Sequence, residues 1–157
     1  MKKKEDFILR TYKKARWCYK KNIPLLPRLI TEIIRVIYSC EIPWLSSIGD
    51  NVAFPHKGLG VVVHPDAIIK DGTTILQNVT IGGKTGKKGA PQIGENCIIG
   101  AGTSILGDVK IGDNCIIGAN SVILKDIPNN CVVVGAPGKI IKRDINRSDY
   151  DWEPDKC

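Results

Sequence analysis

Residues 93–123 read IGENCIIGAGTSILGDVKIGDNCIIGANSVI, and the spacing of isoleucine within them decides the fold. Isoleucine recurs at every sixth position from Ile93 to Ile123. An α-helix repeats its buried face about every 3.6 residues and a plain β-strand about every 2, so neither element explains a period of six. A fixed longer period indicates stacked units that bury one continuous core.

The repeat extends toward the N-terminus and has two interruptions. Between Ile81 and Ile93 the segment GGKTGKKGAPQ has no apolar position, so we expect residues 82–92 to form a loop that leaves the stack. The step from Ile48 to Val63 is not a multiple of six, so the segment between them breaks the phase of the repeat. We expect function at these interruptions, because loops on a rigid scaffold carry binding and catalytic groups. The earlier positions of the repeat are Val63, Ile69, Ile75 and Ile81.

Length and composition fit one soluble domain. The chain has 157 residues, of which 43% are hydrophobic, 25% are charged and only 6% are aromatic. No apolar run approaches the ~20 residues that a membrane span needs. The start, MKKKEDFILR, lacks the apolar stretch of a secretory signal. We therefore expect a cytoplasmic protein whose six cysteines are reduced.

The charge divides the chain near residue 47. Residues 1–47 hold 11 Lys and Arg against 4 Asp and Glu, which accounts for the whole net charge of +7. Apolar spacing and the prolines Pro24 and Pro27 predict two helices, about 3–21 and 27–40. A basic helical face is usually just solvated; an anionic membrane surface suits it better than nucleic acid, which we do not expect. The predicted parts are a basic helical arm (1–47), a repeat domain (48–141) and a C-terminal tail (142–157).

His56 is the first candidate for chemistry. It lies in FPHKGLG, at the out-of-phase segment of the repeat. A neutral imidazole near pH 7 is the best side-chain base for a hydroxyl nucleophile. The alternative interpretation is a solvated turn residue.

Four longer phrases resemble a known family. EIPWLSSIGDNVAFPHKGLGVVV, TTILQNVTIGG, PQIGENCIIGAG and VVVGAPGKIIK lie within residues 41–142. They resemble the catalytic half of the serine acetyltransferases, and also the wider hexapeptide O-acetyltransferases that act on sugars. The resemblance implies a mainly β fold, a left-handed parallel β-helix in which three hexapeptides form one triangular coil. It also implies acetyl-CoA as the acetyl donor.

The resemblance assigns catalytic roles by position. His56 matches the general base that takes the proton of the acceptor hydroxyl. Glu41 falls where serine acetyltransferases carry an aspartate that orients this histidine; the alternative is a surface charge at the end of the arm. His64, in VVVHPDAII, is a further candidate that would supplement His56, although this phrase is also common at corners of such solenoids.

The resemblance also indicates how acetyl-CoA is held. Ala101 and Ala119, in IGAGT and IGANS, match positions whose backbone contacts the pantetheine arm. Lys125, Lys139 and Lys142 match basic positions that meet the CoA phosphates, and a Lys point charge suits a phosphate. The alternative for the three lysines is ordinary solvated side chains.

Departures from the family pattern concern the acceptor. Serine acetyltransferases carry an Arg-His pair at the end of the projecting loop, where this chain has Gly89 and Ala90. The aspartate that commonly precedes the first histidine is Pro55. These departures remove the expected binder of an amino-acid carboxylate. They favour a sugar or polysaccharide-precursor hydroxyl as acceptor, with L-serine as the alternative.

The position of the site predicts how copies of the chain assemble. A prism filled with isoleucine has no internal cavity, so we expect the site between three copies of the chain, in a homotrimer. A non-catalytic β-helix scaffold is the rival from another class. A zinc carbonic anhydrase on this fold needs three histidines and the chain has two, so we expect no metal. Cys97 and Cys115, which the repeat places one coil apart, are interpreted as small core residues and not as a disulfide or metal pair.

Overall fold

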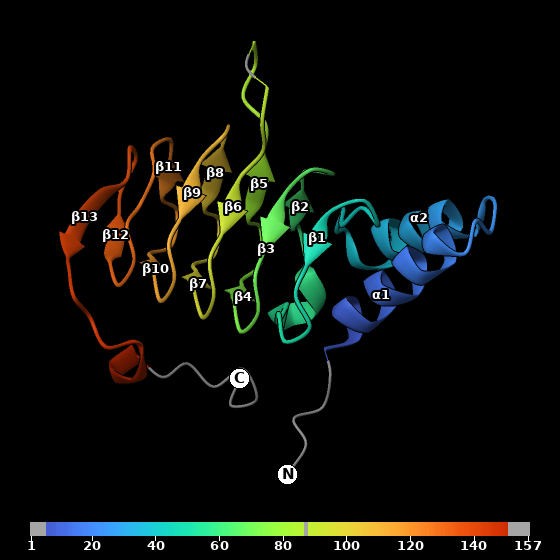
Figure 1. The fold of residues 1–157 in the computed structure, drawn as a ribbon, viewed down its shortest axis with the longest axis horizontal. Helices are drawn as coiled ribbons and strands as arrows, with labels where there is room; N and C mark the ends of the chain where they lie inside the picture. The colour runs from blue at the N-terminus through green and yellow to red at the C-terminus, as the bar shows by residue number, and fades with distance from the viewer. Residues whose placement is uncertain (1–5, 87, 151–157) are drawn as a thin grey trace.

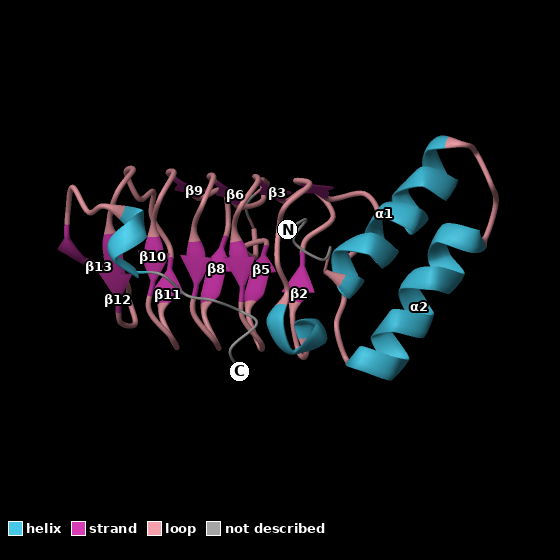
Figure 2. Cartoon of the chain, turned by 90° about the horizontal axis from the view of Figure 1, so that it is seen from below, coloured by secondary structure: helices cyan, strands magenta, loops and turns pink. Residues whose placement is uncertain are grey.

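A computed structural model describes residues 6–86 and 88–150. The chain winds into a solenoid of stacked coils with three flat faces, and two helices close one end (Figures 1 and 2). Face A consists of β2 (Val62–Val63), β5 (Thr80–Gly82), β8 (Ser104–Leu106) and β11 (Val122–Ile123). Face B consists of β1 (Ser47–Ile48), β3 (Ile68–Ile69), β6 (Gln92–Ile93) and β9 (Lys110–Ile111). Face C consists of β4 (Thr74–Ile75), β7 (Ile98–Ile99), β10 (Ile116–Ile117), β12 (Val132–Val134) and β13 (Lys139–Lys142).

The sixfold period sets the register of every face. Neighbouring strands pair in parallel with aliphatic residues stacked on one another, as Ile81 stacks on Ile105 and Ile99 on Ile117. None of the ten period positions is more than 3% exposed, so these side chains fill the inside of the prism. Burying one such side chain contributes roughly 1.5–3 kcal/mol. The predicted mainly β fold, a parallel β-helix, is therefore confirmed.

The small fifth position of each hexapeptide is buried at the corners. Cys97 and Cys115 are both 0% exposed, and each thiol donates to a carbonyl oxygen 3.1 Å away, on Gly112 and Pro128 respectively. The described cysteines are free and buried, whereas Cys157 lies outside the described residues. Cys97 and Cys115 thus act as small core residues that satisfy backbone acceptors.

Two α-helices form the arm. They are α1 (Phe7–Lys20) and α2 (Leu26–Tyr38). Residues 3–5 of the first predicted helix lie outside the described residues. The Asp6 carboxylate caps α1 by accepting from the N–H groups of Ile8 and Leu9. The second helix ends two residues earlier than predicted, because Ser39 adopts a left-handed conformation with φ of 51°.

The arm packs directly on the first coil. Ile8, Leu9 and Tyr12 of α1 belong to the same buried cluster as the isoleucines of the repeat. The Tyr12 hydroxyl donates to the carbonyl of Ser46, which also accepts from the Arg16 guanidinium. Burial raises the pKa of Tyr12, so the phenol stays a neutral donor. The helical arm is therefore the cap that closes the open end of the β-helix.

The interruptions of the repeat lie at corners of the prism. The out-of-phase segment forms a short 3₁₀ turn, η1 (Pro55–Gly58), between faces C and A. Residues 83–86 and 88–89, in the connection from β5 to β6, project from the β-helix within the predicted range 82–92 (Figure 1). Over residues 6–86 and 88–150, no helix is long and apolar enough to cross a membrane.

The C-terminal segment turns back on the solenoid. Strand β13 pairs antiparallel with β12, unlike all other strand pairs of the described chain. After it, η2 (Arg147–Tyr150) is tied down by a hydrogen bond of 3.1 Å from the Arg147 guanidinium to the carbonyl of Asn96. The remainder of the predicted tail, residues 151–157, lies outside the described residues.

Candidate active site

One corner of the prism gathers several predicted site residues. It joins face C to face A and consists of residues 56–60, 76–78, 100–102 and 118–120; we call it the Gly-Ala corner. Backbone hydrogen bonds run up it from one turn to the next, joining Asn78 to Leu59, Gly102 to Gln77, and Asn120 to Ala101. Stacked coils lie about 4.8 Å apart, so His56 and Ala119 are separated by three steps, or roughly 14 Å.

His56 lies at the end of this corner that is nearest to the helical arm. Its backbone is left-handed, with φ of 54°, and its side chain is exposed. The turn is closely surrounded, since a Cβ on Gly58 would lie 3.7 Å from side-chain atoms of Cys40, Ile8 and Phe54. Burial raises the pKa of the Cys40 thiol to about 11, so this neighbour stays protonated near neutral pH. The structure thus presents the imidazole outward from a rigid turn.

Glu41 lies on the adjoining edge of face A. Its N–H donates to the carbonyl of Val61 at 2.8 Å, and it forms a parallel bridge with Val62. Its carboxylate is paired with Arg35 of α2, with 3.8 Å between Oε2 and Nε. Among the described residues, no hydrogen bond joins Glu41 to His56. The carboxylate expected to orient the histidine is thus shared with the helical arm in a single chain.

His64 occupies a different corner. The turn from face A to face B, from which residues 83–86 and 88–89 project, is called the loop corner here. His64 Nδ1 accepts from the N–H of Asp66 at 3.1 Å, so the neutral ring carries its proton on Nε2. A Cβ at Gly83 would lie 3.5 Å from that Nε2, which places the ring edge at the base of the projecting loop. One chain does not bring His64 together with His56, since the two lie on opposite sides of face A.

The predicted CoA residues lie in three places: on the Gly-Ala corner, in β13 and on the loop corner. Ala101 is half-buried and Ala119 exposed, both on the Gly-Ala corner. Lys139 and Lys142 lie in β13, at the end of face C that is farthest from His56. Lys125 is exposed on the loop corner and so is separated from the other four in a single chain.

The short distance between the backbones of successive coils explains why the Gly-Ala corner carries small residues. A Cβ on Gly100 would lie 2.5 Å from the backbone nitrogen of Ala119 and 2.7 Å from the carbonyl oxygen of Ile117. Only glycine lets successive turns stack this closely. The resulting ridge has little side chain on it, which leaves backbone groups open to an extended ligand.

Gln77 is a residue that the sequence reasoning missed. It lies on the Gly-Ala corner between the levels of His56 and Ala101, and its side-chain Oε1 is buried without a hydrogen-bond partner in the described structure. Buried polar atoms are nearly always paired, so an unpaired one calls for an explanation such as a ligand or a second chain. The signal was its position in ILQNV, two residues after the period isoleucine Ile75.

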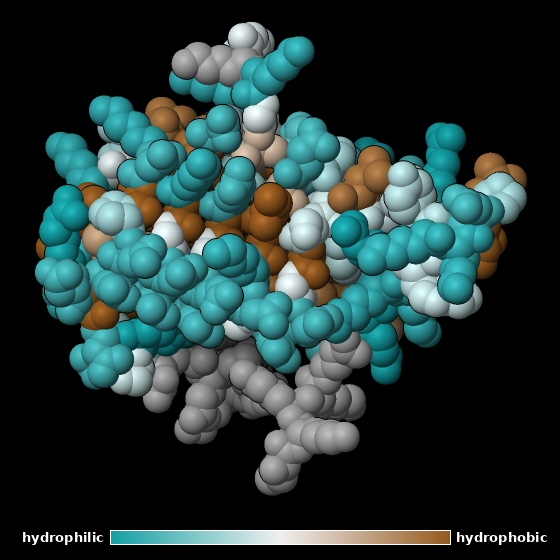
Figure 3. All heavy atoms as spheres, viewed as in Figure 1, coloured by the Kyte–Doolittle hydropathy of each residue, from teal (hydrophilic) through white to brown (hydrophobic). Residues whose placement is uncertain are grey.

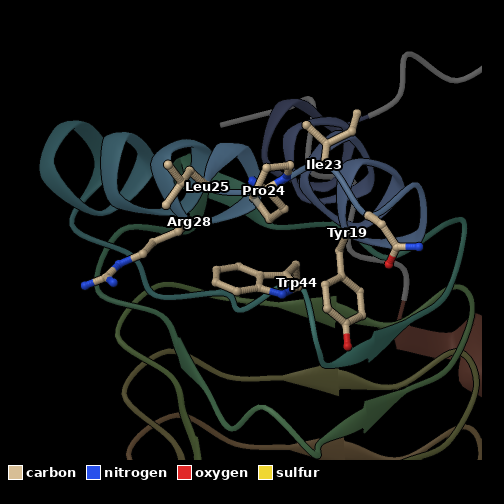
Figure 4. Close-up of a pocket in the computed structure, with 8 residues that line it drawn as sticks. Tyr19, Ile23, Pro24, Leu25, Arg28 and Trp44 are labelled. Atoms are coloured by element: carbon tan, nitrogen blue, oxygen red, sulfur yellow. The ribbon is translucent and has the colours of Figure 1, made fainter.

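A separate hollow of about 310 Å³ lies between the helical hairpin and the first coil. Figure 4 shows Trp44 and Tyr19 on one side of it, and Ile23, Pro24 and Leu25 on the other. None of the predicted site residues lines it. Within residues 6–86 and 88–150, no three His, Cys, Asp or Glu side chains gather as a metal site would require.

Comparison with family models locates the repeat. A model described as bacterial transferase hexapeptide (six repeats) matches residues 90–125. A second, described as hexapeptide repeat of succinyl-transferase, matches residues 72–107. Both fall inside the stacked coils, on the strands that build the prism.

Relatives and solved structures extend the match over most of the chain. A serine acetyltransferase of Synechococcus elongatus is 38% identical over 147 residues, which is 90% of this chain and 59% of that protein. One from Staphylococcus xylosus is 44% identical over 132 residues, or 82% of this chain and 60% of that protein. The structure of serine acetyltransferase in complex with coenzyme A from Brucella abortus matches with a TM-score of 0.82 and 32% identity, over 86% of this chain and 54% of that one.

A complex with serine is also similar. Soybean serine acetyltransferase complexed with serine matches with a TM-score of 0.79 and 32% identity, over 85% of this chain and 56% of that one. Similarity to these structures confirms that the β-helix is left-handed. The chain spans between half and three fifths of the length of these matched proteins.

Proposed function

Since this chain belongs to the hexapeptide-repeat, serine acetyltransferase-like acyltransferases, we propose that it transfers the acetyl group of acetyl-CoA to a hydroxyl of a small acceptor. The main support is the Gly-Ala corner. It carries an exposed histidine at one end and small residues on the two levels of Ala101 and Ala119, the farther of which is about 14 Å from His56. Similarity to an enzyme solved with coenzyme A supports the same conclusion.

The proposed chemistry uses His56 as general base. Its imidazole takes the proton of the acceptor hydroxyl as the oxygen attacks the thioester carbonyl of acetyl-CoA. The C–O bond forms and a tetrahedral oxyanion results. The C–S bond then breaks, and the imidazolium returns the proton to the departing CoA sulfur. The products are the O-acetyl ester and free CoA.

Binding of acetyl-CoA follows the same corner. The pantetheine arm would run along Ala101 and Ala119 toward His56, because the side chains on these two levels are small. Lys139 and Lys142 lie at the far end, where their charges would meet the phosphates. The exposed Lys125, on the loop corner, would contribute only if CoA lies between two copies of the chain.

Glu41 is proposed as a positioning residue for His56. Its carboxylate is about half-exposed and is paired with Arg35, and such a surface ion pair costs little to break. Glu41→Gln should lower turnover and shift the pH profile of kcat. An unaltered pH profile with lower thermal stability would mean that Glu41 only ties α2 to the β-helix.

L-serine is the acceptor that we propose first. The named relatives and solved neighbours are serine acetyltransferases, one of them complexed with serine. These comparisons favour L-serine over the sugar hydroxyl that the sequence pattern suggests. The carboxylate of serine would then need a cation other than the missing arginine, and Lys84 and Lys88 are exposed on the projecting loop.

A sugar hydroxyl remains as the second candidate because of Gly89 and Ala90. Gly89 has φ of +110°, and a Cβ there would lie 2.6 Å from Cβ of Asp108. Ala90 is only 6% exposed. The two positions that hold an Arg-His pair in serine acetyltransferases are thus occupied by residues packed against this protein's own coil, which leaves no charged group there for a carboxylate.

An acceptor panel distinguishes these alternatives. Free CoA released from acetyl-CoA is measured with L-serine, homologous amino acids and sugars, and kcat/KM is compared. We expect release with L-serine above all others; a preference for a sugar would support the second candidate. No release with any acceptor, together with no thermal shift by CoA, would favour a non-catalytic scaffold.

We also propose a homotrimer with sites between subunits. His56 and the Gly-Ala corner are on the outside of a filled prism, and a ligand the size of CoA needs a concave site. Three prisms about a threefold axis would supply three equal clefts and could bring His64 or Lys125 of one chain to His56 of the next. Light scattering should give three times 17.2 kDa. A fully active monomer would contradict the shared cleft.

A further inference from the structure

The connection between α1 and α2 carries exposed apolar side chains. We call residues 20–29 the hairpin tip; they read KKNIPLLPRL. Leu25 is 80% exposed and Leu29 is 55% exposed, and Leu26 is also exposed. The tip lies at the end of the molecule remote from β13 (Figures 1 and 2), and hydrophobic side chains reach the surface at this end (Figure 3). Exposing several leucines together is unusual on a protein surface and marks an interaction site.

The backbone holds Leu25 outward. Leu25 has φ of 64° and ψ of −31°, and a positive φ is strained for a bulky side chain. Pro24 and Pro27 on either side restrict the chain further. The hollow beneath the tip, lined by Trp44 and Tyr19, leaves space under the loop instead of a packed core (Figure 4). The positive φ and the two prolines hold Leu25 in this exposed position.

Basic residues surround these leucines. Lys20, Lys21 and Arg28 are all exposed within the tip. Described residues 6–47 hold eight Lys and Arg against three Asp and Glu, so the helical hairpin that bears the tip carries a positive excess. Trp17 and Tyr19, 57% and 50% exposed, lie in the last turn of α1 beside it. Such aromatic side chains favour the boundary between water and lipid.

We propose that the hairpin tip inserts shallowly into the surface of an anionic lipid bilayer. Leu25, Leu26 and Leu29 would enter the acyl boundary while the surrounding cations meet lipid phosphates, as in other amphipathic surface anchors. A second copy of the chain fits less well. A twofold contact between tips would oppose Lys20, Lys21 and Arg28 of one chain to the same residues of the other.

Membrane attachment of this kind is separate from the acetyl-transfer site. The tip contains none of the residues proposed to bind acetyl-CoA or to act on the acceptor, so a tip variant should retain acetyl transfer in solution. An enzyme held at a bilayer by its cap would present the remainder of the β-helix to the water. The proposal therefore stands or fails independently of the acceptor.

Vesicle flotation with the full chain tests the proposal. We expect binding to vesicles that mix phosphatidylcholine with the anionic lipid phosphatidylglycerol, and little binding to vesicles of phosphatidylcholine alone. Leu25→Asp should weaken binding about ten-fold or more, since one buried leucine side chain is lost. The double change Lys20→Gln with Lys21→Gln, which removes two positive charges, should weaken it about 25-fold, at roughly five-fold per charge. Folding of each variant is checked by circular dichroism.

Val36→Asp is the matched control. Val36 is as exposed as Leu25, at 80%, but lies near the other end of α2. It should bind vesicles like the unaltered protein. Equal loss in both variants would overturn the assignment to the tip, and equal binding to both vesicle types would overturn the role of charge. A drop in oligomeric mass of Leu25→Asp by light scattering, without any vesicle binding by the unaltered protein, would identify the tip as a subunit contact instead.

Discussion

The β-helix buries its aliphatic side chains, whereas the helical arm leaves several of its own exposed to solvent. Ile75, Ile99 and Ile105 are 0% exposed, because each stacks on equivalent positions of neighbouring coils. On α2, Ile33 and Ile37 are 48% and 63% exposed. The β-helix therefore completes its own core, whereas the arm uses only one side of α2 to close that core and leaves the other side free for contacts.

The net charge is also distributed unequally between the β-helix and the arm. Residues 48–157 carry equal numbers of positive and negative side chains, while the arm carries the excess. Chemistry and recognition are thus separated along the chain: the proposed acetyl transfer uses the neutral prism, and the proposed lipid contact uses the basic end. Each of the following changes acts on one region and leaves the other as its control.

His56→Ala should have the strongest effect, and it should be confined to turnover. Losing a general base costs about 10²- to 10⁴-fold in kcat. The affinity for CoA should stay nearly unchanged, since the ridge of the Gly-Ala corner is intact. Free CoA is measured by a thiol reagent and affinity by calorimetry. Val36→Ser on the arm serves as the control with normal activity; near-normal turnover of His56→Ala would remove the proposed mechanism.

Ile99→Ala should lower the free energy of unfolding by about 3 kcal/mol, because it leaves a cavity among stacked isoleucines. Ile33→Ala on the arm should change it by less than about 0.5 kcal/mol. Urea unfolding followed by circular dichroism compares the two. A similar loss in both would show that the outer side of α2 is buried in the assembled protein, which would weaken the contrast between the regions.

Gly100→Ala should destabilise the protein by about 2 kcal/mol through a backbone clash. The added Cβ meets the nitrogen of Ala119 at 2.5 Å, and a stacked coil cannot move away without disturbing its neighbours. Gly83→Ala is the control, since its Cβ would meet only His64 at an ordinary 3.5 Å. If thermal unfolding gives equal midpoints for both variants, coil spacing at the Gly-Ala corner is looser than described.

Asp50→Asn should have the smallest effect, and it should depend on pH. Lys13 Nζ lies 2.9 Å from Oδ1 of Asp50, and this hydrogen bond lowers the pKa of the carboxyl. A lowered folded pKa adds stability above the ordinary carboxyl pKa, and this stability is lost as pH falls through the folded value. The midpoint difference from the unaltered protein should therefore be small at pH 7 and decrease further as the pH falls below the ordinary carboxyl pKa. A difference independent of pH would rule out the ion pair between arm and β-helix as its cause.

Much of the fold was predictable because it repeats. The buried isoleucines, the small fifth positions and the projecting loop all follow from the period of six, and the structure confirms them. The helices were also expected, but the exposure of Leu25 was not. Its strained backbone depends on where two prolines lie relative to the end of α1, and periodicity contains no signal for it.

The candidate site could be predicted only in part from the sequence. The sequence by itself determined which residues could do chemistry and which positions stack, since a six-residue period is a local property of the chain. Tertiary structure alone decided that His56 shares a corner with Ala101 and Ala119 but not with His64 or Lys125, because two interruptions change the phase between coils. It also decided that Glu41 meets Arg35, because docking of the arm through Tyr12 and Arg16 is a long-range contact that no local pattern encodes.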